Sequence, residues 1–240
     1  MSGSPAFVVE HIGAPALGEV RRAGRRSVKR LAQAMMPQSV IVWHGPGRPP
    51  AGARSGASPV ALTFDDGPDP MTRDYLAVLA DLGVRATFFL VGSRCAQHPR
   101  MVSEIHDAGH ELAVHGYTHR RFTTLRSREI ADELGRTRDL LPETRQPLVR
   151  PPHGAVSFRS LFTCARRGFT TVLWSHDSGD ARTDRSEDVV KTFERGAVER
   201  GDISLLHEGQ RWTLHALPRI VSRLKDEGHA PVTVGELLHG

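Results

Sequence analysis

The chain has 240 residues, of which 39% are hydrophobic and 25% charged, a composition typical of a globular domain and unlike that of a disordered or membrane-embedded chain. The formal net charge is +5, but six positive charges lie within residues 21–30, and without them the balance is −1. Nucleic-acid binding normally requires a basic surface spread over a domain. We therefore expect no nucleic-acid partner.

Residues 1–57 are expected to form an N-terminal extension and linker. The sequence predicts a short strand near residues 7–9, a basic helix over residues 21–30, a second strand over residues 39–43, and a linker rich in Gly, Pro, Ser and Ala over residues 45–58. On the helix the basic side chains repeat at i, i+4 and i+8. They form either a solvated helix face, the simpler interpretation, or a contact with an anionic lipid or glycan surface.

Membrane and export signals are not evident in the sequence. No run approaches the roughly 18 apolar residues that indicate a membrane span, and the paired arginines near the start precede no apolar signal-peptide core. We expect no transmembrane segment and a cytoplasmic location; secretion would be expected only if the assigned start codon hides a leader.

From residue 58 to residue 240, strand-length hydrophobic runs alternate with helical patterns. Strands are expected at residues 60–64, 86–91, 111–115, 147–152, 169–174, 203–207 and 231–234, and helices at residues 73–82, 99–108, 127–141, 157–167, 186–199 and 211–226. This alternation is typical of βα units around a parallel sheet. About seven units favour an α/β fold of the distorted (β/α) barrel type, with an open doubly wound sheet as the alternative. In both, ligands bind where strands end, so polar clusters at those points are candidates for chemistry.

The first such cluster is Thr-Phe-Asp-Asp-Gly-Pro at residues 63–68. Adjacent side chains on an extended backbone point to opposite sides. One of Asp65 and Asp66 can thus bind a metal while the other faces the substrate. Taken alone, this motif is explained equally well by a simple turn.

The second cluster, His-Gly-Tyr-Thr-His, places His115 and His119 four residues apart after an expected strand. On a helical turn both imidazoles would lie on one face, within reach of one metal. Together with one carboxylate, the two imidazoles would leave coordination positions on the metal free for water and for a substrate oxygen. A metal bound in this way lowers the pKa of its bound water toward about 7. The sequence therefore predicts one divalent metal.

The third cluster is Arg-Pro-Pro-His-Gly at residues 150–154. Pro152 and its neighbours fix an irregular backbone that can aim an N–H near His153 at a developing oxyanion. Arg150 can bind a carboxylate. A rigid turn without chemistry is the alternative.

Two more clusters complete the set. Asp177 and Asp180 lie three residues apart after the strand expected at residues 169–174, and His207 ends the strand expected at residues 203–207. A histidine is suited to act as a general acid near neutral pH, particularly when a carboxylate fixes its tautomer.

In the order and spacing of its motifs, the chain resembles the polysaccharide deacetylases, which are the family four carbohydrate esterases. The motifs are TFDDGP, HGYTH, RPPHG, DSGD and ISLLH, and the resemblance covers residues 60–238. It implies a distorted (β/α) barrel that removes acetyl groups from amino sugars or acetylated glycans. It also implies one divalent metal, with zinc expected and cobalt, nickel or manganese as alternatives. The metal ligands it implies are Asp66, His115 and His119, with Asp65 as the general base.

The resemblance assigns further roles. Arg150 would hold Asp65, the backbone N–H around His153 would stabilise the oxyanion, and His207, oriented by Asp180, would protonate the departing amine. Leu205 would line the acyl pocket, and Asp177 is expected to support the ion-pair network.

One departure concerns the acyl group. Ala181 stands where the family usually has a tryptophan that walls the acetyl pocket, so we expect either a roomier pocket or a wall supplied by Trp212 or Trp43. The expected substrate is an acylated amino sugar, an oligosaccharide or a glycosylated small molecule. The alternatives are an O-acyl glycan esterase, a deformylase, and a catalytically silent glycan-binding domain; because silent relatives usually lose a ligand or the base, the last is the least expected.

Overall fold

The computed structural model describes residues 37, 39–45, 56–144 and 146–239. The strand predicted near residues 7–9, the basic helix over residues 21–30 and most of the predicted linker lie outside the described residues. Among those described, no helix is both long and apolar enough to cross a membrane.

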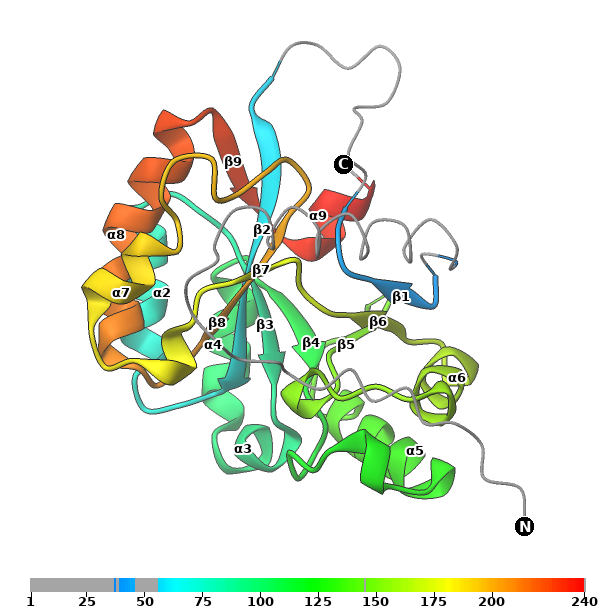
Figure 1. The fold of residues 1–240 in the computed structure, drawn as a ribbon. Coiled ribbons are helices and arrows are strands. Elements are labelled where there is room, and N and C mark those ends of the chain that lie inside the picture. The colour runs from blue at the N-terminus through cyan, green and yellow to red at the C-terminus, as the bar shows by residue number, and fades with distance from the viewer. Residues whose placement is uncertain (1–36, 38, 46–55, 145, 240) are drawn as a thin grey trace.

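One parallel sheet forms the centre of the described fold (Figure 1). Its strand order is β1-β6-β5-β4-β3-β2-β8-β7, with β9 added beside β2. The strands are β1 (Ile41–Val42), β2 (Ser58–Gly67), β3 (Thr87–Leu90), β4 (Glu111–Val114), β5 (Leu148–Val149), β6 (Thr170–Val172), β7 (His176–Asp177), β8 (Ile203–His207) and β9 (His229–Val232). In the part of the chain that is described, no ladder joins β1 to β7, so the curled sheet is an incompletely closed barrel.

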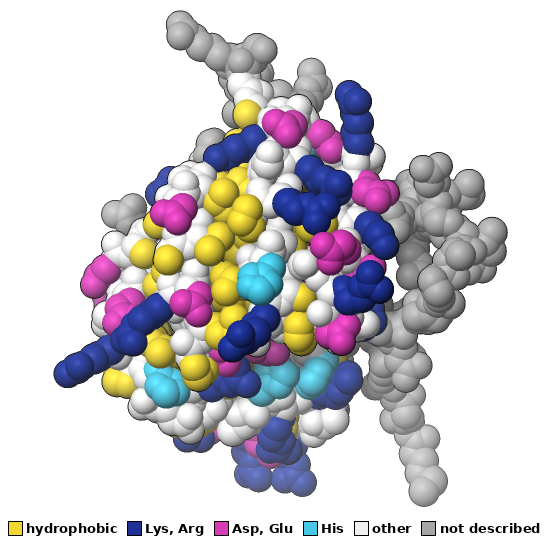
Figure 2. Space-filling model, turned by 90° about the vertical axis from the view of Figure 1, so that its left-hand side faces the viewer, with side chains coloured by type: hydrophobic (Ala, Val, Ile, Leu, Met, Phe, Trp, Pro, Cys, Tyr) yellow, Lys and Arg dark blue, Asp and Glu magenta, His cyan; other side chains and the backbone are white. Residues whose placement is uncertain are grey.

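Helices follow most strands and cover the outside of the sheet. They are α2 (Thr72–Asp81), α3 (Gly92–Gln97), α4 (Pro99–Asp107), α5 (Ser127–Arg138), α6 (Phe158–Arg166), α7 (Ser186–Lys191), α8 (Arg211–Asp226) and α9 (Val234–His239). Short 3-10 turns lie at η1 (Phe122–Thr124), η2 (Pro152–Gly154) and η3 (Asp180–Arg182). The face over α7 and α8 carries charged side chains of both signs among apolar ones (Figure 2).

The predicted α/β class and parallel sheet are confirmed. The described sheet has nine strands rather than about seven, because β1 joins it from within the predicted extension by pairing with β6, and because two-residue β7 follows β6 closely. The boundary at residues 57 and 58 stays a prediction. Helix α7 ends at Lys191, short of the predicted residue 199, and α3 was not predicted.

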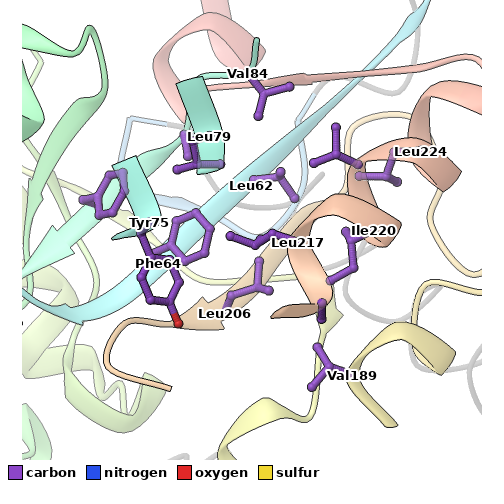
Figure 3. Close-up of a cluster of buried hydrophobic side chains, with 14 of the residues drawn as sticks. Leu62, Phe64, Tyr75, Leu79, Val84, Val189, Leu206, Leu217, Ile220 and Leu224 are labelled. Carbon is purple, nitrogen blue, oxygen red and sulfur yellow. The ribbon is translucent and has the colours of Figure 1, made fainter. Parts of the chain in front are cut away.

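Successive side chains of β2 point alternately into the hydrophobic core and toward the candidate site. Leu62 and Phe64 are buried among helix residues such as Leu217 of α8 (Figure 3). Because successive side chains of a strand point to opposite faces, Thr63 and Asp65 project into the barrel instead. The strand therefore anchors the helices with one face and contributes polar groups to the interior with the other.

Candidate metal and catalytic site

A bulge at the end of β2 separates the two aspartates. Asp65 remains in register with Phe89 of β3 and His207 of β8, but the β3 pairing shifts between Asp65 and Gly67. Asp66 has a φ of 74°, in the left-handed region that few non-glycine residues adopt. The carboxylates do reach different partners, as predicted, but the cause is this bulge rather than a regular extended strand.

The prediction of a helical turn for His115 and His119 is wrong. Residues 115–119 form an irregular loop after β4, with Gly116 at φ 75° and His119 at φ 59°. The imidazoles nevertheless converge on Asp66: Nε2 of His119 lies 2.9 Å and Nε2 of His115 lies 3.4 Å from Oδ1. The positive φ angles of these two residues thus bring the imidazoles together, which the i, i+4 spacing on a helical turn was expected to do.

Glu133 holds this loop and was not found from the sequence. Its Oε2 accepts hydrogen bonds from the backbone N–H of Tyr117 (2.6 Å) and of Thr118 (2.8 Å). The carboxylate is buried on the inner face of α5 beside Ile130 and Leu134. The sequence did contain one indication of this role: Glu133 occupies a position on the inward face of the expected helix, and a buried carboxylate needs hydrogen-bond partners.

The donor set fits a divalent metal. Ligand atoms of Asp66, His115 and His119 lie within 4.8 Å of one another, and Oδ1 of Asp66 is buried without a hydrogen-bond partner. His115 Nδ1–H donates to the carbonyl of Arg150 (2.7 Å). This bond fixes the tautomer so that the Nε2 lone pair faces the cluster.

Electrostatics keep the Asp66 carboxylate ionised. Burial raises its pKa, but the contacts with His115 and His119 outweigh this and leave the pKa well below its ordinary value. One carboxylate and two imidazoles are typical zinc ligands, and other first-row divalent metals accept the same donors. The three residues are therefore the candidate metal ligands.

Arg150 lies beneath the site with no exposed surface. Its Nη1 donates to Oδ1 of Asp65 (2.7 Å) and to Oγ1 of Thr63 (2.8 Å), while Nε and Nη2 each donate at 3.2 Å to the carbonyls of Val172 and Leu173. A buried guanidinium is tolerated only when paired and hydrogen-bonded. This arrangement confirms the predicted contact between Arg150 and Asp65 and fixes one carboxylate oxygen.

His207 and Asp180 form a second pair. His207 donates from its backbone N–H to Oδ2 of Asp180 (2.7 Å) and from Nδ1–H to Oδ1 (2.8 Å). Thr213 also donates to Oδ2 (2.9 Å). Burial lowers the pKa of His207, but the bond to Asp180 and the nearby carboxylate charges raise it overall to about 9. The predicted orientation of His207 by Asp180 is present.

The Arg-Pro-Pro-His-Gly segment lies beside the metal ligands. His153 has a φ of 62°, and its exposed ring lies 4.8 Å from that of His119 between centroids. Pro152 is buried near Gly116. Gly154 packs on Trp174, where an added Cβ would meet the ring at 2.4 Å. The aim of the His153 backbone N–H at an oxyanion stays a prediction.

Asp177 and Leu205 lie near the Asp180 turn. Asp177 accepts from the backbone N–H of Gly179 (2.8 Å) and pairs with Arg182 (3.2 Å), so it stabilises the turn that carries Asp180. Leu205 is buried on β8, two residues before His207 and thus on the same face of the strand.

Of the two tryptophans considered for the acyl-pocket wall, Trp212 lies near Ala181. Its indole N–H donates to the carbonyl of Asp180 (2.8 Å), the residue before Ala181. Trp43 instead packs with Ile41, near β1. Of the two tryptophans, Trp212 is therefore the one near position 181, and its side chain does not replace the one missing at Ala181.

Glu208, also missed from the sequence, supports the bulge of β2. It is buried, accepts from Thr72 Oγ1 (2.6 Å), and fills the space that a side chain at Gly67 would need. Burial raises its pKa to about 8. Only glycine at position 67 permits this close approach.

Residues 52–172 match the sequence model of a family described as polysaccharide deacetylase. A peptidoglycan-N-acetylglucosamine deacetylase of Bacillus cereus is 31% identical over 87% of this chain and 97% of its own length. A chitooligosaccharide deacetylase of Sinorhizobium fredii is 32% identical over 72% of this chain and 89% of its own length. The structure of a family 4 carbohydrate esterase from Streptomyces lividans in complex with acetate superposes with a TM-score of 0.67 at 34% identity, covering 72% of this chain and 91% of the esterase.

Replacing His119 by alanine removes one of the three ligand atoms. Loss of a residue that only orients a ligand typically weakens metal binding 10- to 100-fold, so we expect His119→Ala to lower zinc affinity by more than about a hundredfold. Equilibrium dialysis against zinc measures this. His106→Ala, an exposed histidine of α4, is the matched control, and equal zinc affinity in both variants would contradict the assignment.

Proposed function

Because the chain belongs to the polysaccharide deacetylase family, we propose that it removes an N-acyl group, acetyl or another, from an amino sugar by metal-dependent hydrolysis. The observation that supports this most strongly is the position of Asp65. It lies between a candidate metal cluster and a buried arginine, 3.7 Å from His115 Nε2 and 2.7 Å from Arg150 Nη1. Relatives are named for peptidoglycan and for chitooligosaccharides. The substrate we propose is an acylated amino sugar in an oligosaccharide or glycosylated small molecule.

Asp66, His115 and His119 would hold the metal, which we propose to be zinc, with cobalt, nickel or manganese able to use the same ligands. When bound, it would supply a water of lowered pKa and polarise the acyl carbonyl. Asp65 is the proposed base. With Oδ1 engaged by Arg150, Oδ2 is the oxygen left to accept a proton, and the guanidinium holds the carboxylate in one orientation.

His207 is the proposed acid on the other side of the site. Amide hydrolysis expels a poor leaving group, an amine, which must gain a proton as the bond to carbon breaks. Asp180 fixes the Nδ1–H tautomer and so directs protonated Nε2–H outward. The raised pKa of His207 keeps this proton in place at neutral pH.

The alternatives within hydrolases are an O-acyl glycan esterase and a deformylase. A protonated His207 favours amide hydrolysis, because an alkoxide leaving group needs less help than an amine. A catalytically silent glycan-binding domain is not favoured, since the base, the acid and three candidate ligands all lie together. The expected cytoplasmic location stays a prediction.

Asp65→Asn tests the proposed reaction. Loss of a general base costs about 10²- to 10⁴-fold in rate, so release of acetate or another acid from a panel of acyl amino sugars should fall by at least about a hundredfold. Because Arg150 would lose its charged partner, circular dichroism and zinc content must show a folded, metal-binding variant. Asp107→Asn on α4 is the control. Full turnover by Asp65→Asn, or by wild type after chelation and dialysis, would refute the proposal.

The pH dependence of kcat tests His207. The acid is active only when protonated, so kcat should fall as the pH rises through about 9. In Asp180→Asn the charge that raises this pKa is lost while burial still lowers it, so the alkaline limb should move to lower pH. Asp74→Asn, an exposed site on α2, should keep the wild-type profile. An alkaline limb that is unchanged in Asp180→Asn would exclude His207 as the acid.

Ala181→Trp tests the acyl pocket. With only a methyl group at position 181, we propose that the pocket accepts acyl groups longer than acetyl. Turnover of an acyl-chain series should show that the variant loses the longer substrates by at least about tenfold relative to acetyl, since one methylene in a pocket is worth about 1–3 kcal/mol. Strict acetyl preference in both wild type and variant would contradict this.

A further inference from the structure

Two segments beside the candidate site are strongly basic. Residues 118–130 run from the loop of His119 through η1 into α5, and residues 153–167 run from η2 through α6. They contain a single carboxylate, Glu129, whose Oε2 accepts from the backbone N–H of Arg126 at the start of α5. Their seven arginines are all exposed: Arg120, Arg121, Arg126, Arg128, Arg159, Arg166 and Arg167. Among the described residues, none of the seven forms an ion pair with a carboxylate.

The two segments form one continuous surface. Arg159 of α6 donates from Nη1 to the carbonyl of Leu125 (3.3 Å), just after η1. Helices α5 and α6 lie together at the lower right of Figure 1. The surface also reaches the site, because Arg120 directly follows His119 in the chain.

Two phenylalanines protrude from this basic surface. Phe158 is 84% and Phe162 is 53% exposed, and their rings stack at 6.2 Å between centroids with an interplanar angle of 12°. The guanidinium of Arg166 lies 5.7 Å from the Phe162 ring. These three residues recur at i, i+4 and i+8 on α6, so they form one stripe. Elsewhere in the described chain, Leu140 is the one other large hydrophobic residue that is exposed.

We propose that this arginine–phenylalanine surface docks on an anionic lipid bilayer. Exposed aromatic rings flanked by cations are the pattern by which helices lie in a membrane interface: the rings enter the acyl boundary and the cations contact headgroup phosphates. A soluble polyanion that lacks apolar surface would satisfy the arginines but leave both rings largely in water. The opposite face of the molecule, over α7 and α8, mixes charges of both signs (Figures 1 and 2), so the docking surface gives the protein one orientation.

This docking would place the candidate site at the membrane surface. The metal-ligand residue His119 lies at the border of the basic segments, so the acyl sugar would be carried on a lipid. That consequence rests on the proposed deacylase function, whereas the docking itself does not. The substrate class is thus narrowed to a membrane-bound glycolipid or lipid-linked amino sugar.

Sedimentation of the full chain with vesicles tests the docking. Wild type should bind phosphatidylcholine vesicles that contain phosphatidylglycerol and bind pure phosphatidylcholine at least tenfold more weakly. Phe158→Ser/Phe162→Ser should weaken binding to the anionic vesicles at least tenfold. Arg166→Gln/Arg167→Gln should weaken it by about fivefold for each arginine, which corresponds to about 1 kcal/mol per residue near an anionic surface.

The matched control is Arg195→Gln/Arg219→Gln, which removes the same charge from exposed positions beyond α7 and on α8 and should bind as wild type does. Both test variants should keep wild-type thermal unfolding and wild-type turnover of a soluble acyl sugar, and Asp65→Asn should bind vesicles normally. Wild type that does not bind anionic vesicles overturns the proposal. The proposal is also overturned if both test variants bind anionic vesicles as tightly as wild type, which is the result expected if residues 21–30 alone contact the membrane. Capture of a soluble acidic polysaccharide through these residues, without vesicle binding, would also overturn it.

Discussion

The buried pair of Arg150 and Asp65 is the interaction on which the site depends. The guanidinium sits inside the curled sheet with no exposed surface and donates to groups on β2, at the last residue of β6 and just beyond it. It also lies 4.0 Å from the Phe89 ring centroid. Removing either partner would leave an uncompensated buried charge, which typically costs 3–5 kcal/mol. The same contacts orient Asp65, and the carbonyl of Arg150 fixes the tautomer of His115. Arg150 thus connects the fold, the proposed base and a candidate metal ligand.

Around this pair the proposed base and the proposed acid have different electrostatic partners. Asp65 pairs with a buried cation, Arg150, while the buried carboxylate of Asp180 contributes to the raised pKa of His207. Opposite electrostatic partners therefore prepare the two groups for opposite proton transfers. The candidate metal ligands lie beside Asp65, with His115 within 3.7 Å of it.

Much of this was predictable because the chemistry lies at strand ends. The candidate ligands Asp66, His115 and His119 were found by residue type and by position, at the end of β2 and after β4, and the parallel sheet brings those ends together. The local geometry was not predictable in the same way. A bulge at Asp66 and a positive φ at His119 depend on packing from other elements rather than on nearby residues.

Supporting residues were missed for a related reason. Glu133 and Glu208 act through contacts with segments distant in the chain, and neither belongs to a motif. The docking surface likewise emerges only when two basic segments are brought side by side, since net charge gave no hint of it. Conversely, the position of Ala181 was informative from the sequence, and the structure added that Trp212 lies beside it.

The central claim is that Asp66, His115 and His119 bind one catalytic metal next to Asp65. A crystal structure of the zinc-loaded protein, with anomalous diffraction recorded at the zinc edge, tests it most directly. We expect one strong peak about 2.0–2.2 Å from one oxygen of Asp66 and from Nε2 of both histidines, with Arg150 still bound to Asp65. A peak elsewhere, or zinc held without Asp66 or either histidine, would contradict the account.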